Sequence, residues 1–173
     1  MTDFRGLLSA LSDAGVEFIL VGGVAATAHG SARLTLDVDV VYRRSPGSIE
    51  RLVTALAPLH PYLRGVPPGL PFRWDARTLR SGLNFTLTTD LGDLDLLGEI
   101  VGGGRFEDLV PRTVGIRVFE MECRCLDLDT LIHVKRAAGR PKDLEAIAEF
   151  EAIREGQRRS QASRARFAST MER

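Results

Sequence analysis

The hydrophobic positions divide the first third of the chain into short segments of helical and strand type. Apolar residues three and four apart predict a helix over residues 3–14, which stops at Gly15. A short apolar run at residues 17–21 predicts a buried strand. This strand leads through Gly22-Gly23 into a small, alanine-rich helix that ends at Gly30. The predicted order is therefore strand, glycine turn, helix.

Strict alternation makes residues 34–42 the clearest strand in the chain. Its two faces hold Leu34, Leu36, Val38 and Val40 on one side, and Thr35, Asp37 and Asp39 on the other. Ser45-Pro46 then opens a helix that is expected to run to about Ala57, because proline is favoured at the first helical position.

The remaining pattern predicts further strands followed by helices. Residues 58–71 contain five prolines and predict an irregular connection. Segments 83–87 and 94–97 predict a hairpin around a turn at residues 90–92. A strand over 114–120, continued in extended form by 123–126, precedes a helix capped by Asp127 and a last helix over 142–154. The fold class is therefore α+β: a mixed β-sheet flanked by helices, expected on one side, with a small C-terminal helical part.

Two carboxylates on the clearest strand are the first candidates for chemistry. Asp37 and Asp39 project to the same side of that strand, with backbones roughly 6–7 Å apart. Like charges at this spacing repel unless a cation lies between them, and oxygen ligands suit Mg²⁺ or Mn²⁺. An isolated Asp-x-Asp is more often a solvated pair on a surface strand. The upstream Gly22-Gly23 turn changes this balance, because glycine lets a backbone approach a phosphate closely.

A third carboxylate is available on the predicted hairpin. Asp95 has apolar neighbours on both sides, whereas Asp93 shares its face but lies nearer the turn, so Asp95 is the preferred ligand. Two metal ions about 3.5–4 Å apart, held by three carboxylates, can clamp the attacking and leaving oxygens of an in-line displacement.

Composition and charge limit the partners. The chain has 173 residues, of which 44% are hydrophobic, and its 23 basic residues balance its 23 acidic ones. Polyanion binding must then come from a local patch. The tail over residues 154–173 is biased: Arg154, Arg158, Arg159, Arg164, Arg166 and Arg173 are opposed only by Glu155 and Glu172. This tail is either a solvated chain end or an RNA-binding arm.

Targeting and redox signals are weak. The N-terminal residues do not form the apolar core of a signal peptide, and no stretch approaches the length of a membrane span, so a cytoplasmic protein without membrane contact is expected. Cys123 and Cys125 lie two residues apart and are expected to be reduced and structural.

The motif over residues 22–39 resembles the polymerase-β-like nucleotidyltransferase superfamily. It reads Gly-Gly-x-Ala-x-x-x-His-Gly-x-x-Arg-x-Thr-x-Asp-x-Asp, and Asp95 follows on a neighbouring strand. The set is similar to a small bacterial branch that includes AbiEii-type toxins of toxin–antitoxin systems. The segment from Lys135 to Leu144, with Lys142-Asp143, is similar to the C-terminal part of that branch. The resemblance covers residues 15–153.

The resemblance implies a role for each motif residue. Gly22 and Gly23 would hold the triphosphate, and Asp37, Asp39 and Asp95 would bind two Mg²⁺ or Mn²⁺ ions. Asp95 could also accept the proton of the attacking hydroxyl. Lys135 would neutralise phosphate charge and Asp143 would orient Lys135 or the base, while Arg33 either reaches the phosphates or is a solvated charge. Many members have serine at the position of Gly23, so here only backbone contacts to phosphate are expected there.

The implied activity is transfer of a nucleoside monophosphate from a nucleoside triphosphate to an acceptor hydroxyl. The nucleotidyltransferase core would span 1–100, a strand and helical extension of the same domain 101–153, and a basic, flexible tail 154–173. The expected acceptor is RNA, at a tRNA 3′ end, for a toxin with a cognate antitoxin. The alternatives are a protein or small-molecule (antibiotic) hydroxyl, or an inactive module that binds a nucleotide or a partner.

Overall fold

A mixed sheet forms the centre of the structure. The computed structural model describes residues 1–67 and 69–171, with side chains except those of residues 142 and 165–171, and over this range the main sheet has seven strands in the order β3-β4-β5-β2-β1-β9-β8. Its strands are β1 (Phe18–Val21), β2 (Asp37–Tyr42), β3 (Tyr62–Leu63), β4 (Asn84–Thr89), β5 (Gly92–Leu97), β8 (Thr113–Val118) and β9 (Met121–Leu126). A small separate hairpin consists of β6 (Glu99–Ile100) and β7 (Gly104–Arg105).

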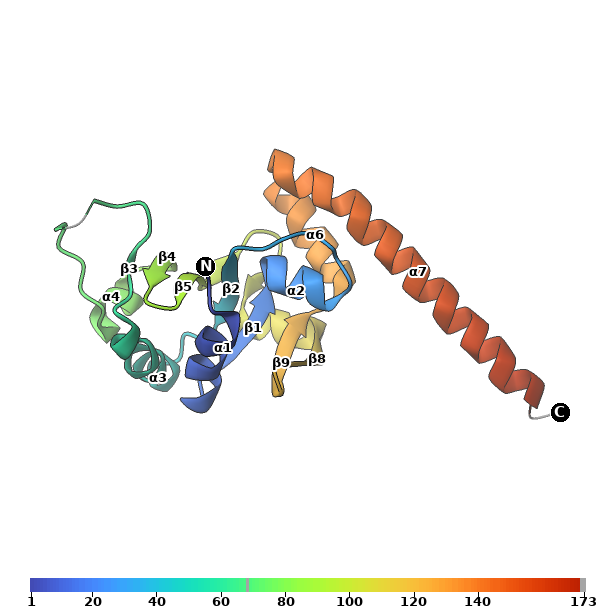
Figure 1. Ribbon diagram of the computed structural model, residues 1–173, viewed down its shortest axis with the longest axis horizontal. Helices are drawn as coiled ribbons and strands as arrows, with labels where there is room; N and C mark the ends of the chain where they lie inside the picture. The colour runs from blue at the N-terminus through green and yellow to red at the C-terminus, as the bar shows by residue number, and fades with distance from the viewer. Residues whose placement is uncertain (68, 172–173) are drawn as a thin grey trace.

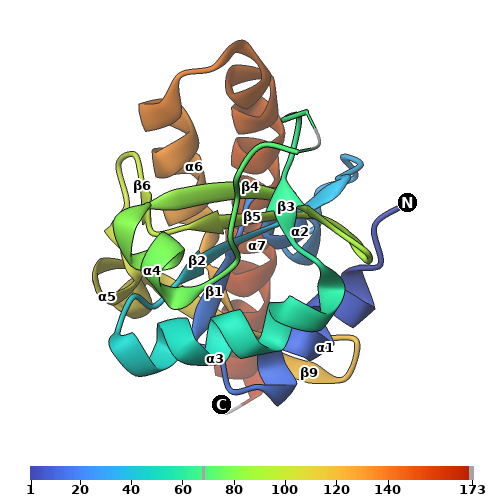
Figure 2. The same cartoon turned by 90° about the vertical axis from the view of Figure 1, so that its left-hand side faces the viewer.

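Helices lie on both sides of this sheet. They are α1 (Phe4–Asp13), α2 (Gly22–Ala28), α3 (Pro46–Leu56), α4 (Ala76–Ser81), α5 (Phe106–Leu109), α6 (Leu128–Ala138) and α7 (Pro141–Met171). Helices α1 and α3 cover one side and α6 the other (Figure 2). The α+β class is confirmed, whereas the expectation that helices lie on one side was wrong. The segment after β9 crosses to the second side because its apolar residues pack against α2.

Alternation along the central strands produces the core. Val38 and Val40 of β2 and Leu94 and Leu96 of β5 are fully buried and join the leucines of α1 and α3 in the main hydrophobic cluster. The intervening residues of β2 and β5 face the opposite side of the sheet. A second cluster joins α2, α6 and α7 and contains Ala26, Leu128, Ile132, Ala146, Ile147 and Phe150. The sheet therefore places one set of side chains in the core and the other toward α6 and α7.

Strand β2 is shorter than the alternation predicted. Its ladder begins at Asp37, which pairs with Asp93 of β5, and its pairing with β1 begins at Asp39. Residues 34–36 lie outside the ladders with β1 and β5, so the predicted start of this strand at residue 34 was wrong. Leu34 is 90% and Leu36 72% exposed.

The C-terminal third also differs from the prediction in two places. Residues 121–126 reverse direction as β9 and pair antiparallel with β8, and the turn consists of Phe119 and Glu120, both with positive φ (48° and 70°). Helix α7 does not end near Arg154 but continues to Met171 and projects away from the sheet (Figure 1). Pattern reasoning also missed the short elements β3, α4, β6 and β7.

Both predicted helix starts are confirmed. Ser45 caps α3 and Asp127 caps α6, each by accepting a backbone N–H with its side chain. Cys123 and Cys125 are buried on β9 and are not joined in a disulfide. Among the described residues, no helix combines the length and the apolar character needed to cross a bilayer.

Candidate active site

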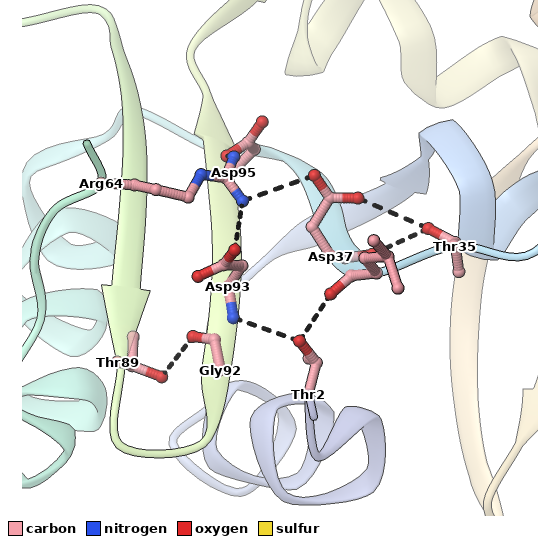
Figure 3. Close-up of polar contacts among 9 residues, drawn as sticks. Thr2, Thr35, Asp37, Arg64, Thr89, Gly92, Asp93 and Asp95 are labelled. Atoms are coloured by element: carbon pink, nitrogen blue, oxygen red, sulfur yellow. Dashed lines mark hydrogen bonds and ion pairs between the residues drawn. The ribbon is translucent and has the colours of Figure 1, made fainter.

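Four aspartates lie side by side on the two central parallel strands. The register of β2 and β5 places Asp37 opposite Asp93 and Asp39 opposite Asp95. Among the described residues, carboxylate oxygens of Asp37, Asp39 and Asp95 all lie within 4.8 Å of one another. Figure 3 shows the side chains of Asp37, Asp93 and Asp95, which lie close together around Arg64. The structure thus brings together the three carboxylates that the sequence singled out as metal ligands, with Asp93 at the edge of the group.

The electrostatics of this group favour a bound cation. Burial raises the pKa of Asp39 from 3.8 to about 7, and repulsion from Asp37 and Asp95 adds to the rise. The backbone N–H of Gly23 and the charge of Lys135 oppose it. Burial also raises the pKa of Asp95. Closely spaced carboxylates held against their own repulsion are a donor set that suits a hard divalent ion such as Mg²⁺ or Mn²⁺, so these residues fit the metal that the sequence predicted.

The glycine turn after β1 lies directly against Asp39. Gly22 adopts a φ of +60°, and a Cβ at this position would lie 2.0 Å from Asp39 Oδ2. A side chain here would therefore both strain the backbone and displace the central carboxylate. This close approach is expected where the backbone of the turn and a metal ion would both contact the carboxylate of Asp39.

Basic groups from α6 and from the turn that leads into α7 form another wall. Lys135 Nζ lies 3.0 Å from Asp143 Oδ1, and Arg140 Nε lies 2.6 Å from Asp143 Oδ2. Asp143 is only 1% exposed. Its burial works to raise its pKa, but hydrogen bonds from Arg140 and Lys135 outweigh this and hold the pKa below its usual value. Gly139, with a φ of 64°, ends α6 and lets α7 turn back so that Asp143 meets Lys135.

One pocket joins all the residues that the sequence proposed. Gly22, Gly23, Arg33, Lys135 and Asp143 line it together with the three carboxylates. Arg33 occupies the wall but turns to α7, where its Nε donates to Glu149 Oε2 at 2.9 Å. Thr35, Arg140, Ala146 and Phe150 also line the pocket. The pocket is thus acidic on the sheet side and basic at the junction of α6 and α7.

Sequence reasoning missed Arg64, which enters the acidic group from the other side. It follows β3, and its guanidinium lies 2.5 Å from Asp95 Oδ1, 3.0 Å from Asp93 Oδ2 and 3.5 Å from Asp37 Oδ2 (Figure 3). Nothing in the proline-rich connection distinguishes this arginine from an exposed one, because the connection has no periodicity. Its side chain is 26% exposed and shares two of the three candidate metal ligands.

We expect the variant Arg64→Gln to bind divalent metal more tightly than the wild type. The arginine competes with a metal ion for Asp37 and Asp95, so its loss should lower the Mn²⁺ dissociation constant roughly tenfold, the scale of one close charge pair. The melting temperature without metal should fall, because the carboxylates lose their counter-ion. Titration by calorimetry and melting in EDTA would measure both effects. The exposed Arg77→Gln on α4 is the charge-matched control, and equal affinities in both variants would contradict direct competition.

Comparisons with known proteins place this site in a nucleotidyltransferase fold. No family model and no curated protein matches the sequence. The fold is similar to lincosamide antibiotic adenylyltransferase LnuA bound to lincomycin, with TM-score 0.57 and 13% identity over 88% of this chain and 98% of that one. It is also similar to TM1012 of Thermotoga maritima, a protein assigned as a nucleotidyltransferase (TM-score 0.53, 14% identity, 88% and 96% covered). The antibiotic-resistance factor ANT(2'')-Ia gives TM-score 0.52 and 16% identity over 96% and 95%.

Proposed function

We propose that the protein is a metal-dependent nucleotidyltransferase of the polymerase-β-like type, which moves a nucleoside monophosphate from a nucleoside triphosphate to an acceptor hydroxyl. The observation that carries this proposal is the group of Asp37, Asp39 and Asp95, whose oxygens lie within 4.8 Å of one another on adjacent strands. A glycine turn on one side and the Lys135–Asp143 pair on another complete the pocket. The fold supports the same conclusion, because nucleotidyltransferases share it.

Two divalent ions, Mg²⁺ or Mn²⁺, would be held by the three carboxylates and would supply charge neutralisation at the phosphate. The acceptor oxygen attacks the α-phosphorus, the bond from this phosphorus to the bridging oxygen of the β-phosphate breaks, and pyrophosphate leaves. Asp95 would take the proton of the acceptor hydroxyl, the role that the resemblance implies for it. Lys135 carries positive charge to the leaving phosphates, and Asp143 fixes its position.

The glycine turn binds the triphosphate in this proposal. Gly22 and Gly23 lack side chains, so a phosphate can reach the backbone beside Asp39. Arg33 lies on the same wall and would contribute charge after release from Glu149. The metal, the turn and Lys135 together would orient the α-phosphate for in-line attack.

The acceptor is the open part of the proposal, and two classes have support. LnuA and ANT(2'')-Ia are named for antibiotics, which favours a small-molecule hydroxyl. The motif resemblance to AbiEii-type toxins favours a tRNA 3′ end, with a cognate antitoxin as partner. Helix α7 beyond Arg154 carries several arginines away from the sheet, which is compatible with RNA contact.

A transfer assay tests the function and separates the acceptors. The protein is incubated with Mg²⁺, each labelled nucleoside triphosphate, and either total tRNA or a panel of hydroxylated antibiotics, beside an Asp39→Ala control. Label on tRNA with the wild type only would support the hypothesis of a toxin that acts on tRNA. Label on an antibiotic would support the hypothesis of a small-molecule acceptor. If triphosphate binds but neither acceptor is labelled, a protein acceptor is tried next. No binding and no transfer with Mg²⁺ or Mn²⁺ would refute the enzymatic proposal.

A further inference from the structure

Arg64 reaches the acidic group from the β4 side of the sheet. Its backbone N–H donates to the carbonyl oxygen of Thr86 at 2.9 Å, and Thr86 pairs with Asp95 in the ladder of β4 and β5. Gly65 follows with a φ of 76°, so the chain turns away directly after the arginine. The backbone of Arg64 is therefore fixed beside the strand that carries Asp95.

The connection around Arg64 is held by contacts within itself. The hydroxyl of Tyr62 lies 3.0 Å from the carbonyl oxygen of Pro67 and 3.3 Å from that of Leu70. The ring of Tyr62 also packs edge-on against Phe72, with the ring centroids 5.8 Å apart. A binding group that is held in place before its ligand arrives loses less freedom when the ligand binds.

A metal ion bound to the acidic group would break two of the three ion pairs of Arg64. Its Nη1 lies 3.5 Å from Asp37 Oδ2, and its Nη2 lies 2.5 Å from Asp95 Oδ1 (Figure 3). Both of these aspartates belong to the candidate metal group. The third pair, from Nη1 to Asp93 Oδ2 at 3.0 Å, involves the carboxylate at the edge of that group. With metal bound, Arg64 would keep Asp93 and recover the donors that the other two pairs use.

The charge balance then leaves Arg64 with an uncompensated positive charge. Two divalent ions would neutralise the four aspartates on β2 and β5, which in the absence of metal share the charge of the arginine. The triphosphate has basic partners of its own, because Arg33, Lys135 and Arg140 line the pocket around the glycine turn. The guanidinium of Arg64, with 26% of its side chain exposed, is therefore available to a second anion.

This second anion would lie near the attacking hydroxyl. The resemblance implies that Asp95 accepts the proton of that hydroxyl, and Arg64 contacts the same carboxylate. An anion on the guanidinium and a hydroxyl on the carboxylate are then separated by at most three hydrogen-bond lengths, roughly 8–9 Å. The 3′ hydroxyl and the 5′ phosphate of one nucleotide fit within this range, because only the ribose and one methylene lie between them.

We propose that Arg64, held by Asp93, binds a phosphate of the acceptor that neighbours the attacking hydroxyl. This inference rests on the proposed function and narrows its acceptor to a molecule that carries a phosphate. The 3′ end of an RNA and a small phosphorylated alcohol both have this chemistry. Arginine suits the role because the planar fork of its N–H donors matches the oxygens of a phosphate.

Matched acceptor probes test this assignment by binding. The first pair is a labelled oligoribonucleotide with a 3′ hydroxyl and the same oligonucleotide with its last phosphodiester replaced by an uncharged methylphosphonate. The second pair is glycerol phosphate and glycerol. Affinities are measured for the wild type, Arg64→Gln, Arg64→Lys and the exposed control Arg77→Gln. Saturating Mg²⁺ and a saturating non-hydrolysable nucleoside triphosphate are present, so that differences in metal affinity do not contribute.

We expect the wild type to bind the charged member of a pair roughly tenfold more tightly than the uncharged one, as for one hydrogen bond to a charged group. Arg64→Gln should bind both members within about twofold of each other, while Arg64→Lys keeps part of the preference and Arg77→Gln keeps all of it. In transfer to the charged probe, Arg64→Gln should raise KM roughly tenfold and change kcat less than about twofold. A preference within the first pair would identify an RNA acceptor, and one within the second pair a small molecule.

Three results would overturn the proposal and leave the transferase function in place. They are equal affinity of the wild type for both members of each pair, failure of both charged probes to bind, and a preference that Arg64→Gln retains. Arg64 would then be only the counter-ion of the acidic group in the absence of metal. A wild type that binds no triphosphate would instead refute the proposed function, and with it this role of Arg64.

Discussion

Replacing Asp39 by asparagine is expected to abolish nucleotidyl transfer and, at the same time, to stabilise the metal-free protein. A carboxylate oxygen of Asp39 lies within 4.8 Å of those of Asp37 and Asp95, and the Gly22 turn packs against the Asp39 side chain. Loss of a central metal ligand should cost several kcal/mol of transition-state stabilisation, so transfer should fall roughly 1000-fold. Asparagine is nearly isosteric with aspartate and carries no charge, so the repulsion from Asp37 and Asp95 is removed. A variant that retained a tenth of wild-type activity would contradict the assigned role.

The stability effect follows from the direction of the pKa shift. Burial, with repulsion from Asp37 and Asp95, raises the pKa of Asp39 from 3.8 to about 7. A group whose folded pKa is raised binds its proton more tightly in the folded state, so its contribution to stability is complete below pH 3.8 and is lost as the pH rises through about 7. The metal-free wild type should therefore lose stability between these two values, and Asp39→Asn should lose less, because of the two residues only Asp95 still has a raised pKa.

Melting curves in EDTA from pH 4 to pH 8 measure this difference. The variant should melt above the wild type at pH 8, and the two curves should converge toward pH 4. Adding Mg²⁺ at pH 8 should raise the melting temperature of the wild type but have little effect on the variant, since the ion replaces the proton as the neutralising charge. The exposed Asp13→Asn, at the end of α1, is a matched control. Equal pH dependence in wild type and Asp39→Asn would show that the acidic group is solvated.

The acidic group could be predicted from the sequence because the positions of its side chains depend on local alternation along each strand. Period-two alternation fixes which side of a strand Asp37 and Asp39 face, and apolar neighbours on both sides of Asp95 mark a buried strand. The only non-local requirement was that these strands be neighbours, and the resemblance supplied it. The residues of the basic wall, Lys135 and Asp143, were found in the same way. The resemblance also implied that Asp143 contacts Lys135, and the structure adds the geometry, with Lys135 Nζ 3.0 Å from Asp143 Oδ1.

Residues that act through spatial contact alone could not be predicted. Arg64 reaches the acidic group because β3 pairs with β4, and no pattern in the proline-rich connection encodes that pairing. A Cβ at Gly23 would lie 2.2 Å from Thr35 Oγ1. This lack of space depends on the path of residues 30–36, which lie outside any strand. The alternation at Leu34 and Leu36 was misleading for the same reason: a side-chain pattern can continue where the backbone has no partner strand.

Asp143→Ala is expected to give the largest loss of stability among single substitutions in the basic wall. The carboxylate is 1% exposed and accepts from Lys135 and Arg140. Removing one partner of a buried pair leaves Lys135 without its counter-ion, at a cost of about 3–5 kcal/mol in the free energy of unfolding. The Arg140 contact contributes little to this, because its side chain is largely exposed. Chemical denaturation of the wild type and the variant would measure the loss.

Two comparisons separate the buried pair from a general effect of charge. Glu145→Ala, an exposed carboxylate two residues further along α7, should change the unfolding free energy by less than about 0.5 kcal/mol. The double variant Lys135→Met/Asp143→Ala should be more stable than Asp143→Ala alone, because no unpaired charge remains. If the double variant were less stable than Asp143→Ala, the result would contradict the assigned pair, because Lys135 would then be stabilised by groups other than Asp143.

The same substitution should change the acid stability in a defined direction. Hydrogen bonds from Arg140 and Lys135 hold the pKa of Asp143 below its usual value against the effect of burial. A lowered folded pKa contributes stability above the unfolded pKa of this carboxyl, and this contribution is lost as the pH falls through the folded pKa. The difference between wild type and Asp143→Ala should thus be largest near neutral pH and shrink in acid. Transfer activity should fall 10- to 100-fold, on the order of one misplaced charged contact, because Lys135 is then free to turn toward Asp39 and away from the phosphates.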